Sequence, residues 1–259
     1  VSGLGLPPGV LNIVTGCGDP AGAELAENSQ VDKIAFTGGT ATGRSVLHAS
    51  AGNLKKLSLE LGGKNPNLVF ADADLEAAVD GALFAAFANQ GEVCSAGSRL
   101  LVESSIHAPF VNALVEKMPR IKVGHGMSPG VKMGALISEA HRNRVEEYIA
   151  VALQEGAVLR AGGSRPAGLS QGYFLEPTLF DEVSPNMRVF REEIFGPVLT
   201  VTPFSNEEEA IRLANDTDYG LAAGVWTRSV TRGLRVLREL RAGITWLNTY
   251  HPTYNELPW

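Results

Sequence analysis

The chain has 259 residues, of which 44% are hydrophobic and 19% charged, proportions typical of a globular protein with one large or two smaller domains. Its 22 basic and 28 acidic residues give a net charge of −6 with no block of like charge, which argues against nucleic acid or a membrane as partner. Two cysteines and five scattered histidines form neither a disulfide framework nor a metal-ligand pattern, so we expect a reduced, cytoplasmic protein without a metal.

The first sixty residues alternate short apolar runs with helical patterns. We expect strands at residues 11–14, 33–36 and 57–60, and helices at residues 21–27 and 41–51. Residues 11–14 are a short, mainly apolar run bounded by glycines, and we interpret both them and residues 33–36 as buried strands. The alternation therefore predicts an α/β fold.

The same alternation continues after the Gly62-Gly63 pair. We expect strands at residues 67–70, 99–102, 198–201, 224–226 and 244–248, and helices at 75–88, 106–118, 145–153, 207–215 and 230–240. Asp72 or Asp74 is the predicted cap of the first of these helices. The pattern predicts a parallel sheet with helices on both faces, a three-layer αβα arrangement. We place a domain boundary at the glycine pair, between residues 1–61 and residues 62–259.

One cysteine lies in a turn of small residues. Cys94 follows the long helical pattern and precedes the strand pattern at residues 99–102, and it is surrounded by glycine, serine and alanine in residues 91–98 (GEVCSAGS). A cysteine that only fills a core falls more naturally inside an apolar run, because its thiol behaves as a small hydrophobe. The position favours a reactive thiol close to backbone N–H groups. A cysteine that merely happens to lie in a loop is the alternative interpretation.

A second stretch, residues 59–66 (LELGGKNP), contains Glu60 and lies 94 − 60 = 34 residues before the cysteine. Together the two stretches resemble the paired active-site signatures of the aldehyde dehydrogenase superfamily. Residues 8–12 (PGVLN), 36–40 (FTGGT) and 193–197 (EIFGP) match further landmarks of that family, so the resemblance covers essentially the whole chain. It implies an aldehyde dehydrogenase-like fold.

The resemblance also implies the chemistry. Cys94 is expected to be the nucleophile that attacks an aldehyde, giving a thiohemiacetal and then a thioester. Glu60 is expected to be the general base for the hydrolytic water, since a carboxylate in a partly dry cleft has a raised pKa. The Cys94 backbone N–H is one expected donor to the oxyanion. A solvated charge at a strand end is the alternative interpretation of Glu60.

The implied cofactor is NAD or NADP, between which the sequence leaves the choice open. The Gly38-Gly39-Thr40 turn joins a strand to a helix, whose N-terminus offers N–H groups to a phosphate. The family resemblance assigns the remaining cofactor contacts to Gly16, Leu61, Glu193 and Phe195. Glu193 corresponds to the acceptor of the ribose hydroxyls, and Phe195 to an aromatic that packs against the nicotinamide ring. A capping acid and a core phenylalanine are the alternatives.

The substrate is expected to be a small-molecule aldehyde. Trp259 and Tyr250 lie where relatives place the wall of the aldehyde tunnel, and residues 248–252 (NTYHP) resemble betaine-aldehyde dehydrogenases. Aromatic walls attract a quaternary ammonium by cation–π interaction, worth about 0.5–2 kcal/mol per ring. Ala88 stands where many relatives have a large aromatic, so the tunnel is expected to be wider.

The chain starts without methionine and stops inside a family motif, so we expect a fragment of a longer enzyme. Residues 1–61 would form the second half of a cofactor domain, and residues 62–259 a catalytic domain. The full-length protein is expected to be a homodimer or homotetramer, and the fragment alone to be inactive. Transfer of the acyl group to coenzyme A and a non-catalytic protein with the same fold are the other hypotheses.

Overall fold

A computed structural model describes residue 3 and residues 5–257 of the chain. The chain divides into two compact units, Val1–Leu61 and Gly62–Trp259, which are described in turn. No helix in the described part of the chain has both the length and the apolar character needed to cross a bilayer.

The first unit is a single strand–helix–strand motif with a short helix beside it. Its elements are η2 (Gly18–Gly22), α1 (Ala23–Glu27), β1 (Lys33–Thr37), α2 (Thr40–Ser50) and β2 (Lys56–Glu60). β1 and β2 pair in parallel from Lys33↔Lys56 to Thr37↔Glu60, with α2 as the crossover. Lys55 is buried and donates to the carbonyls of Ala26 and Asn28 at 2.6 and 2.8 Å. This contact satisfies carbonyls at the C-terminal end of α1.

The expectation of a buried strand at residues 11–14 is wrong. This segment has no strand conformation, and Ile13 and Val14 are 81% and 73% exposed. β1 is a strand as expected, but its residues alternate between exposed and half-buried rather than being fully buried. A parallel strand becomes buried only with strand neighbours and helices on both faces. In the described residues of this unit, β1 pairs with β2 alone.

The second unit is built on a seven-stranded sheet in the order β5-β6-β7-β4-β3-β8-β9. Its strands are β3 (Pro66–Val69), β4 (Arg99–Glu103), β5 (Val158–Ala161), β6 (Thr178–Asp181), β7 (Val198–Phe204), β8 (Ala222–Trp226) and β9 (Ile244–Leu247). Its helices are α3 (Leu75–Phe87), α4 (His107–Lys117), α5 (Glu139–Gln154), α6 (Arg188–Arg191), α7 (Glu207–Asn215) and α8 (Val230–Glu239), with 3₁₀ turns η3 (Ala88–Gly91) and η4 (Met118–Arg120).

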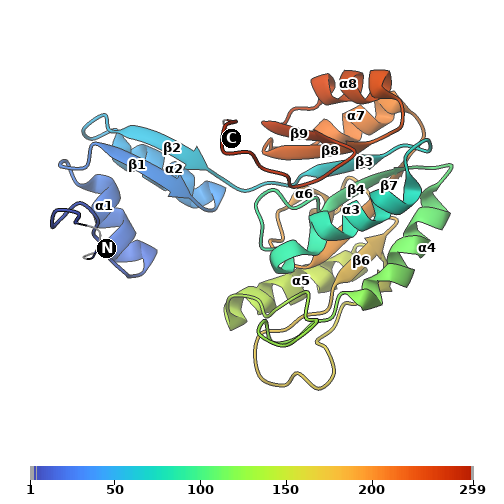
Figure 1. Cartoon of the computed structure of the whole chain (residues 1–259), viewed down its shortest axis with the longest axis horizontal. Coiled ribbons are helices and arrows are strands. Elements are labelled where there is room, and N and C mark those ends of the chain that lie inside the picture. The colour runs from blue at the N-terminus through green and yellow to red at the C-terminus, as the bar shows by residue number, and fades with distance from the viewer. Residues whose placement is uncertain (1–2, 4, 258–259) are drawn as a thin grey trace. The chain divides into compact units, whose positions relative to one another are not determined.

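Helices cover both faces of this sheet, as the three-layer prediction requires (Figure 1). Successive residues of a strand face opposite sides, so Leu68 packs with α5 to α8 while Val69 packs with α3 and α4. The central strands β3 and β4 are almost entirely inaccessible to solvent. The predicted α/β class is therefore confirmed.

Polar side chains fix the starts of four helices. Asp74, Ser138, Asn206 and Ser229 each accept a backbone N–H from the first turn of α3, α5, α7 or α8. Of the two residues predicted as the cap of α3, Asp74 is therefore the one that caps it. Asp72, the other candidate, accepts instead from Thr227 and Arg232, and so ties the end of β3 to the start of α8.

One edge strand of the predicted parallel sheet runs in the opposite direction. β5 runs antiparallel to β6, with a register irregularity between Leu159 and Ala161. This strand has a mostly exposed pattern, so it lacks the apolar run that marks the buried strands. The four-residue α6 also lies below the length at which helical periodicity is visible.

Candidate active site

Three loops meet at the amino ends of adjacent strands in the second unit. They precede β3 (residues 62–65), β4 (residues 94–98) and β7 (residues 193–197). The parallel registers Pro66↔Arg99 and Arg99↔Thr200 place these strands side by side, so the loops come together at one edge. This edge carries Cys94 and Glu193, which lie 99 residues apart in the sequence (193 − 94).

Cys94 lies in a tight turn. The Ala96 N–H donates to the Val93 carbonyl at 3.0 Å, and the side chain of Cys94 is partly buried. The buried Asn65 amide donates to the carbonyls of Cys94 and Ala96 at 2.8 and 2.9 Å. The turn that holds the candidate nucleophile is therefore held from β3 by one side chain.

The same asparagine reaches a third strand. Its Oδ1 accepts the Ala222 N–H of β8 at 3.0 Å, so both ends of the amide are used. Asn65 was not among the predicted site residues. Its signal was available in the sequence, because it follows the Gly62-Gly63 motif and is a polar residue beside an apolar strand. A buried amide must find partners.

The glycine pair allows close approach of two functional groups. A Cβ at Gly62 would collide with the Glu193 carboxylate, and one at Gly63 would collide with the Cys94 carbonyl oxygen. The Gly63 N–H donates to Glu193 Oε1 at 3.1 Å. The two glycines are therefore required where the loop before β3 passes between Glu193 and the cysteine turn.

Glu193 is half-buried. Burial raises the pKa of its carboxyl, while the Gly63 N–H and the charge of Lys64 oppose that shift. The ammonium group of Lys64 is fully buried, and within the described residues its Nζ has no hydrogen-bond partner. The pKa of Lys64 falls to about 7, mainly because the ammonium group is buried and also because the positive charge of Arg99 is near. The structure thus identifies Lys64 as a titratable group that sequence reasoning missed.

Strained backbone brings the chain from α3 to Cys94. Asn89, Gln90 and Gly91 have φ values of 48°, 60° and 71°, and a Cβ at Gly91 would meet the Gly196 carbonyl. Left-handed conformations at non-glycine residues cost on the order of 1–3 kcal/mol each and concentrate at functional sites. The Gln90 side chain compensates by accepting the Gly134 N–H at 2.9 Å.

Phe195 also has a left-handed backbone, with φ 58°, and its side chain is 37% exposed. Its carbonyl accepts from His141 Nε2 at 2.6 Å, and the two rings meet edge to face with centroids 6.0 Å apart. The phenylalanine is therefore not a core residue, and its ring is accessible on the surface of this unit.

The remaining predicted cofactor residues lie in the first unit, and all except Gly16 lie at the carboxyl ends of its strands. Gly38 and Gly39 join β1 to α2, which begins at Thr40, and the Gly38 N–H donates to the Glu60 carbonyl at 3.0 Å. Glu60 ends β2 and is half-buried, as is Leu61, which contacts α2 at Gly43. Gly16 is exposed and lies close to Ala21.

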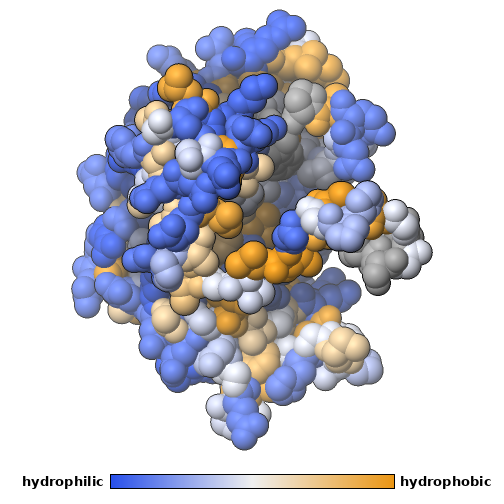
Figure 2. Space-filling view, turned by 90° about the vertical axis from the view of Figure 1, so that its left-hand side faces the viewer, coloured by the Kyte–Doolittle hydropathy of each residue, from blue (hydrophilic) through white to orange (hydrophobic). Residues whose placement is uncertain are grey.

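A groove of about 460 Å³ lies beside these residues in the first unit. Its lining includes the apolar side chains of Leu25, Ile34, Phe36, Val46 and Ala49, contributed by α1, β1 and α2. Its shape and composition suit a flat, largely apolar ring next to the N-terminus of α2. Exposed hydrophobic side chains are also visible among hydrophilic ones on the face drawn in Figure 2.

The predicted substrate residues separate in the second unit. Ala88 lines an open groove of about 640 Å³ with Phe84 and Phe87, and Lys117 and Arg120 also line it. Tyr250 does not form an accessible wall, because it is only 5% exposed and donates its hydroxyl to the Ser95 carbonyl at 3.1 Å. Trp259 lies outside the described residues.

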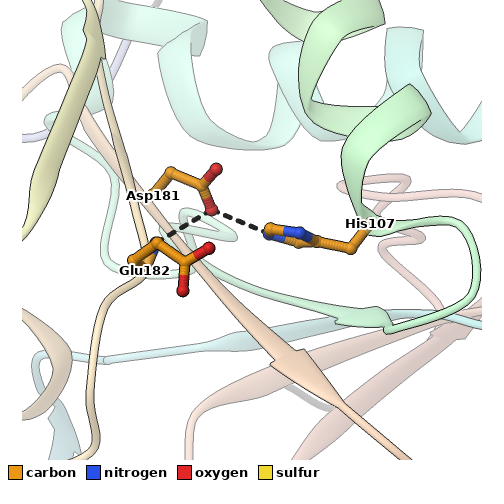
Figure 3. A group of neighbouring side chains, drawn as sticks. All are labelled: His107, Asp181 and Glu182. Atoms are coloured by element: carbon orange, nitrogen blue, oxygen red, sulfur yellow. Dashed lines mark hydrogen bonds and ion pairs between the residues drawn. The ribbon is translucent and has the colours of Figure 1, made fainter.

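One cluster has the residue types of a metal site. His107, Asp181 and Glu182 lie together at the start of α4 and the end of β6 (Figure 3). The Asp181 carboxylate already accepts from His107 at 2.8 Å, from Arg160 at 3.1 Å and from the Glu182 N–H at 2.8 Å. A carboxylate with three donors, one of them a guanidinium, anchors α4 and β5 to β6 rather than offering lone pairs to a cation.

The aldehyde dehydrogenase family model matches residues 1–259. The chain belongs to the aldehyde dehydrogenase family. The chain is 52% identical to betaine aldehyde dehydrogenase of Bacillus subtilis (strain 168) over an alignment of 257 residues. The alignment covers 98% of this chain and 52% of the relative. The chain is 47% identical over 256 residues to the peroxisomal aminoaldehyde dehydrogenase 2 of Pisum sativum, covering 99% and 51%.

A solved structure of betaine aldehyde dehydrogenase from Staphylococcus aureus in complex with NAD⁺ superimposes with a TM-score of 0.97 at 43% identity. The superposition covers 100% of this chain and 52% of the Staphylococcus aureus chain. The chain thus spans about half the length of the curated relatives it matches. This agrees with the expectation of a partial family member.

Proposed function

We propose that the full-length protein containing this chain oxidises an aldehyde to a carboxylic acid with NAD⁺ or NADP⁺, using Cys94 as nucleophile. The observation that carries the proposal is the Cys94 turn, whose carbonyls are bound by Asn65 on one side. In a trans peptide the N–H points opposite to the C=O. The Cys94 N–H shares its peptide with the Val93 carbonyl, which accepts the Ala96 N–H of the same turn at 3.0 Å. The turn therefore fixes the direction of the Cys94 N–H, which suits a developing oxyanion.

The proposed steps begin and end with the Cys94 thiolate. The Cys94 thiolate attacks the carbonyl carbon, and the resulting oxyanion of the thiohemiacetal accepts from the Cys94 backbone N–H. NAD(P)⁺ would supply the hydride acceptor, so that loss of the hydride re-forms the C–O double bond and leaves a thioester on Sγ. Glu60 removes a proton from water as the water attacks the thioester, and the acid leaves while Cys94 departs as thiolate.

The residues present fit a dinucleotide. The N-terminus of α2 at Gly39-Thr40 suits a phosphate, because no side chain caps it and a Cβ at Gly39 would meet no atom within 4 Å. The apolar groove between α1 and α2 suits an adenine ring. Glu193 offers carboxylate oxygens for ribose hydroxyls, and the exposed ring of Phe195 suits contact with nicotinamide. Gly16 and Leu61 are proposed as supporting contacts of the same site.

The proposed substrate class is betaine aldehyde or an amino aldehyde, as the names of the relatives suggest. We expect kcat/KM for betaine aldehyde to exceed that for an uncharged isostere by about 2- to 30-fold, the equivalent of 0.5–2 kcal/mol of cation–π attraction. Trp259→Ala should remove the difference. Equal values for the two aldehydes in the parent protein would contradict this substrate class. Lys117 and Arg120 line the groove beside Ala88, and their positive charges would repel a cationic aldehyde that entered there.

We further propose that residues 1–61 are the second half of the cofactor domain and residues 62–259 a catalytic domain. A cytoplasmic location and a homodimeric or homotetrameric assembly complete the proposal. Plant relatives are named chloroplastic or peroxisomal, so fractionation of the source cells tests the location. Sedimentation of the full-length protein tests the assembly.

The function is tested with purified full-length protein, betaine aldehyde and either NAD⁺ or NADP⁺. Reduced cofactor and betaine should form in equal amounts, and acid quenching should trap acyl groups on Cys94. Cys94→Ala should abolish both, whereas Cys17→Ala at the exposed cysteine should retain them. Oxidation that proceeds only when coenzyme A is present would indicate that the acyl group is transferred to coenzyme A rather than hydrolysed. Turnover by Cys94→Ala at the parental rate would overturn the proposal.

A further inference from the structure

We propose that Tyr250 and His251 are positioning residues that set the direction of the Cys94 backbone N–H through the carbonyl of Ser95. The inference rests on the proposed function, in which that N–H stabilises an oxyanion. It also reassigns Tyr250, which the sequence places in a substrate wall. The two side chains follow β9 at the edge of the sheet, whereas Cys94 precedes β4 near its centre.

Both side chains meet at one oxygen atom. Tyr250 donates its hydroxyl to the Ser95 carbonyl at 3.1 Å, and His251 Nε2 lies 3.2 Å from the same carbonyl. Burial lowers the pKa of His251, which favours the neutral imidazole. A carbonyl only accepts hydrogen bonds, which requires the tautomer with the proton on Nε2.

A slot between two glycines receives the tyrosine ring. A Cβ at Gly97 would lie 3.0 Å from Tyr250 Cζ, and one at Gly224 would lie 2.6 Å from Tyr250 Cδ2. Trp246 packs against the ring with centroids 4.6 Å apart, and the His251 ring meets it edge to face at 4.9 Å. The Tyr250 ring is therefore enclosed on several sides, and its hydroxyl has a defined direction.

Two peptide planes transmit this direction to the nucleophile. The Ser95–Ala96 peptide is held at its carbonyl by Tyr250 and His251, and at its N–H by the Val93 carbonyl, which it meets at 3.0 Å. The Val93 carbonyl belongs to the same planar peptide as the Cys94 N–H. Since a trans peptide points the two groups in opposite directions, fixing the first fixes the second.

Asn65 holds the other two carbonyls of the turn, those of Cys94 and Ala96. The carbonyls of residues 94, 95 and 96 therefore all accept from side chains just before β3 or just after β9. A turn held this way meets the requirement that oxyanion donors be preorganised before the reaction. Asn65 also supports β8, so its replacement would not isolate this effect. Tyr250 and His251 provide the cleaner test.

The experiment compares two reactions of the Cys94 thiol in the full-length protein with Cys17→Ser. Acylation by p-nitrophenyl acetate passes through a tetrahedral oxyanion and releases p-nitrophenolate. Alkylation by iodoacetamide displaces iodide at a saturated carbon and forms no oxyanion. Neither reaction needs the nucleotide. A positioning role for the Cys94 N–H should therefore affect acylation and leave alkylation almost unchanged.

The variants are Tyr250→Phe, His251→Phe and the double variant, with His251→Gln as the conservative replacement that keeps an N–H donor. Tyr173→Phe, at a ring that is 39% exposed, is the matched control. One remaining donor should hold the Ser95 carbonyl, so each single variant should lose less than about tenfold in acylation rate. The double variant should lose roughly 10²-fold, the range of one misplaced oxyanion donor. In the Tyr250→Phe background, His251→Gln should recover most of the acylation rate that His251→Phe loses.

Thermal unfolding must show the double variant folded at the assay temperature. If it is not, the comparison is made between Tyr250→Phe/His251→Gln and Tyr250→Phe/His251→Leu. Unchanged acylation in a folded variant without either donor would overturn the inference. A parallel fall in acylation and alkylation would also overturn it, because that would indicate general damage to the thiol.

The outcomes also separate this inference from the proposed function. Selective loss of acylation in a protein that never reduces NAD(P)⁺ would uphold the positioning role and contradict the dehydrogenase. If the parent oxidises aldehydes normally and the double variant is acylated at the parental rate, the dehydrogenase function would stand and the positioning role would be contradicted. A parent whose Cys94 reacts with iodoacetamide but not with the ester would contradict the positioning role, since no oxyanion donor would be in place.

Discussion

The two units place their candidate functional groups at opposite ends of their strands. In Val1–Leu61, the Gly38-Gly39 turn and Glu60 lie at the carboxyl ends of β1 and β2, the usual position for a nucleotide in an open α/β sheet. In Gly62–Trp259, Cys94 and Glu193 lie in loops at the amino ends of β4 and β7. The cysteine edge is thus not predicted by the general rule for such sheets and depends on side chains that hold its turn.

The units differ equally in burial. β1 alternates between exposed and half-buried residues, whereas β3 and β4 are buried almost throughout. Leu11, Ile13 and Val14 are exposed in the first unit, while the second has apolar layers on both faces of its sheet. A functional group in the second unit therefore stands on a rigid support. One in the first unit stands on a sheet of two strands.

The largest expected effect tests whether the first unit contributes chemistry at all. In the full-length protein, Glu60→Gln keeps the shape of the side chain and removes the base, so steady-state turnover should fall by roughly 10²–10⁴. A burst of reduced cofactor should remain, because acylation of Cys94 does not need that base. Stopped-flow absorbance measures both phases. Parental turnover would show that Glu60 is only a half-buried residue at the end of β2.

A smaller effect compares the stabilities of the two units. Phe110 is fully buried in α4, so Phe110→Ala should lower the free energy of unfolding of the second unit by about 3–5 kcal/mol. Ile13 is 81% exposed, so Ile13→Ala should change stability by less than about 0.5 kcal/mol. Trp226 and Trp246 are buried in the second unit, and their fluorescence in urea follows its unfolding.

Amide hydrogen exchange extends this comparison to the first unit, which the tryptophans do not report. Amides of β1 and β2 should exchange faster than those of β4 and β7, because fewer buried contacts protect them. Equal protection in the two sheets would contradict the difference between the units. It would show that the exposed strands are stabilised by contacts other than burial.

The smallest expected effect is a pH dependence that only the second unit should show. Burial lowers the pKa of Lys64 to about 7 from its usual 10.5. Between these two values the unfolded chain binds more protons than the folded chain, so the free energy of unfolding rises with pH across that window. Lys64→Met should flatten this dependence and stabilise the second unit at pH 7.

Urea unfolding followed by tryptophan fluorescence at pH 7, 8 and 9 measures this slope. Lys132→Met, at an exposed lysine, is the control and should retain the parental slope. The same slope in Lys64→Met as in the parent would show that the Lys64 ammonium is stabilised despite its burial.

The sequence predicted most elements of the second unit because their apolar periodicity is continuous. α7 was predicted at residues 207–215, as observed, and the strands from β3 to β9 were predicted apart from β5 and β6. The family resemblance supplied the roles of Cys94, Glu60 and Glu193, which stay proposals. Residues 11–14 were mistaken for a buried strand, because an apolar run indicates only that a chain segment is able to be buried. Whether it is buried depends on neighbours that the segment does not encode.

What the sequence alone determined was the family and the α/β class, since motifs and periodicity are local properties. Only the tertiary structure showed that Tyr250 lies behind the cysteine turn, and that Asn65 and His251 share the task of holding it. Tyr250 and Cys94 are 156 residues apart (250 − 94), and their relation arises from sheet order and from the space above Gly97 and Gly224. Hydrogen bonds to a buried carbonyl are set by packing in three dimensions, which no linear pattern records.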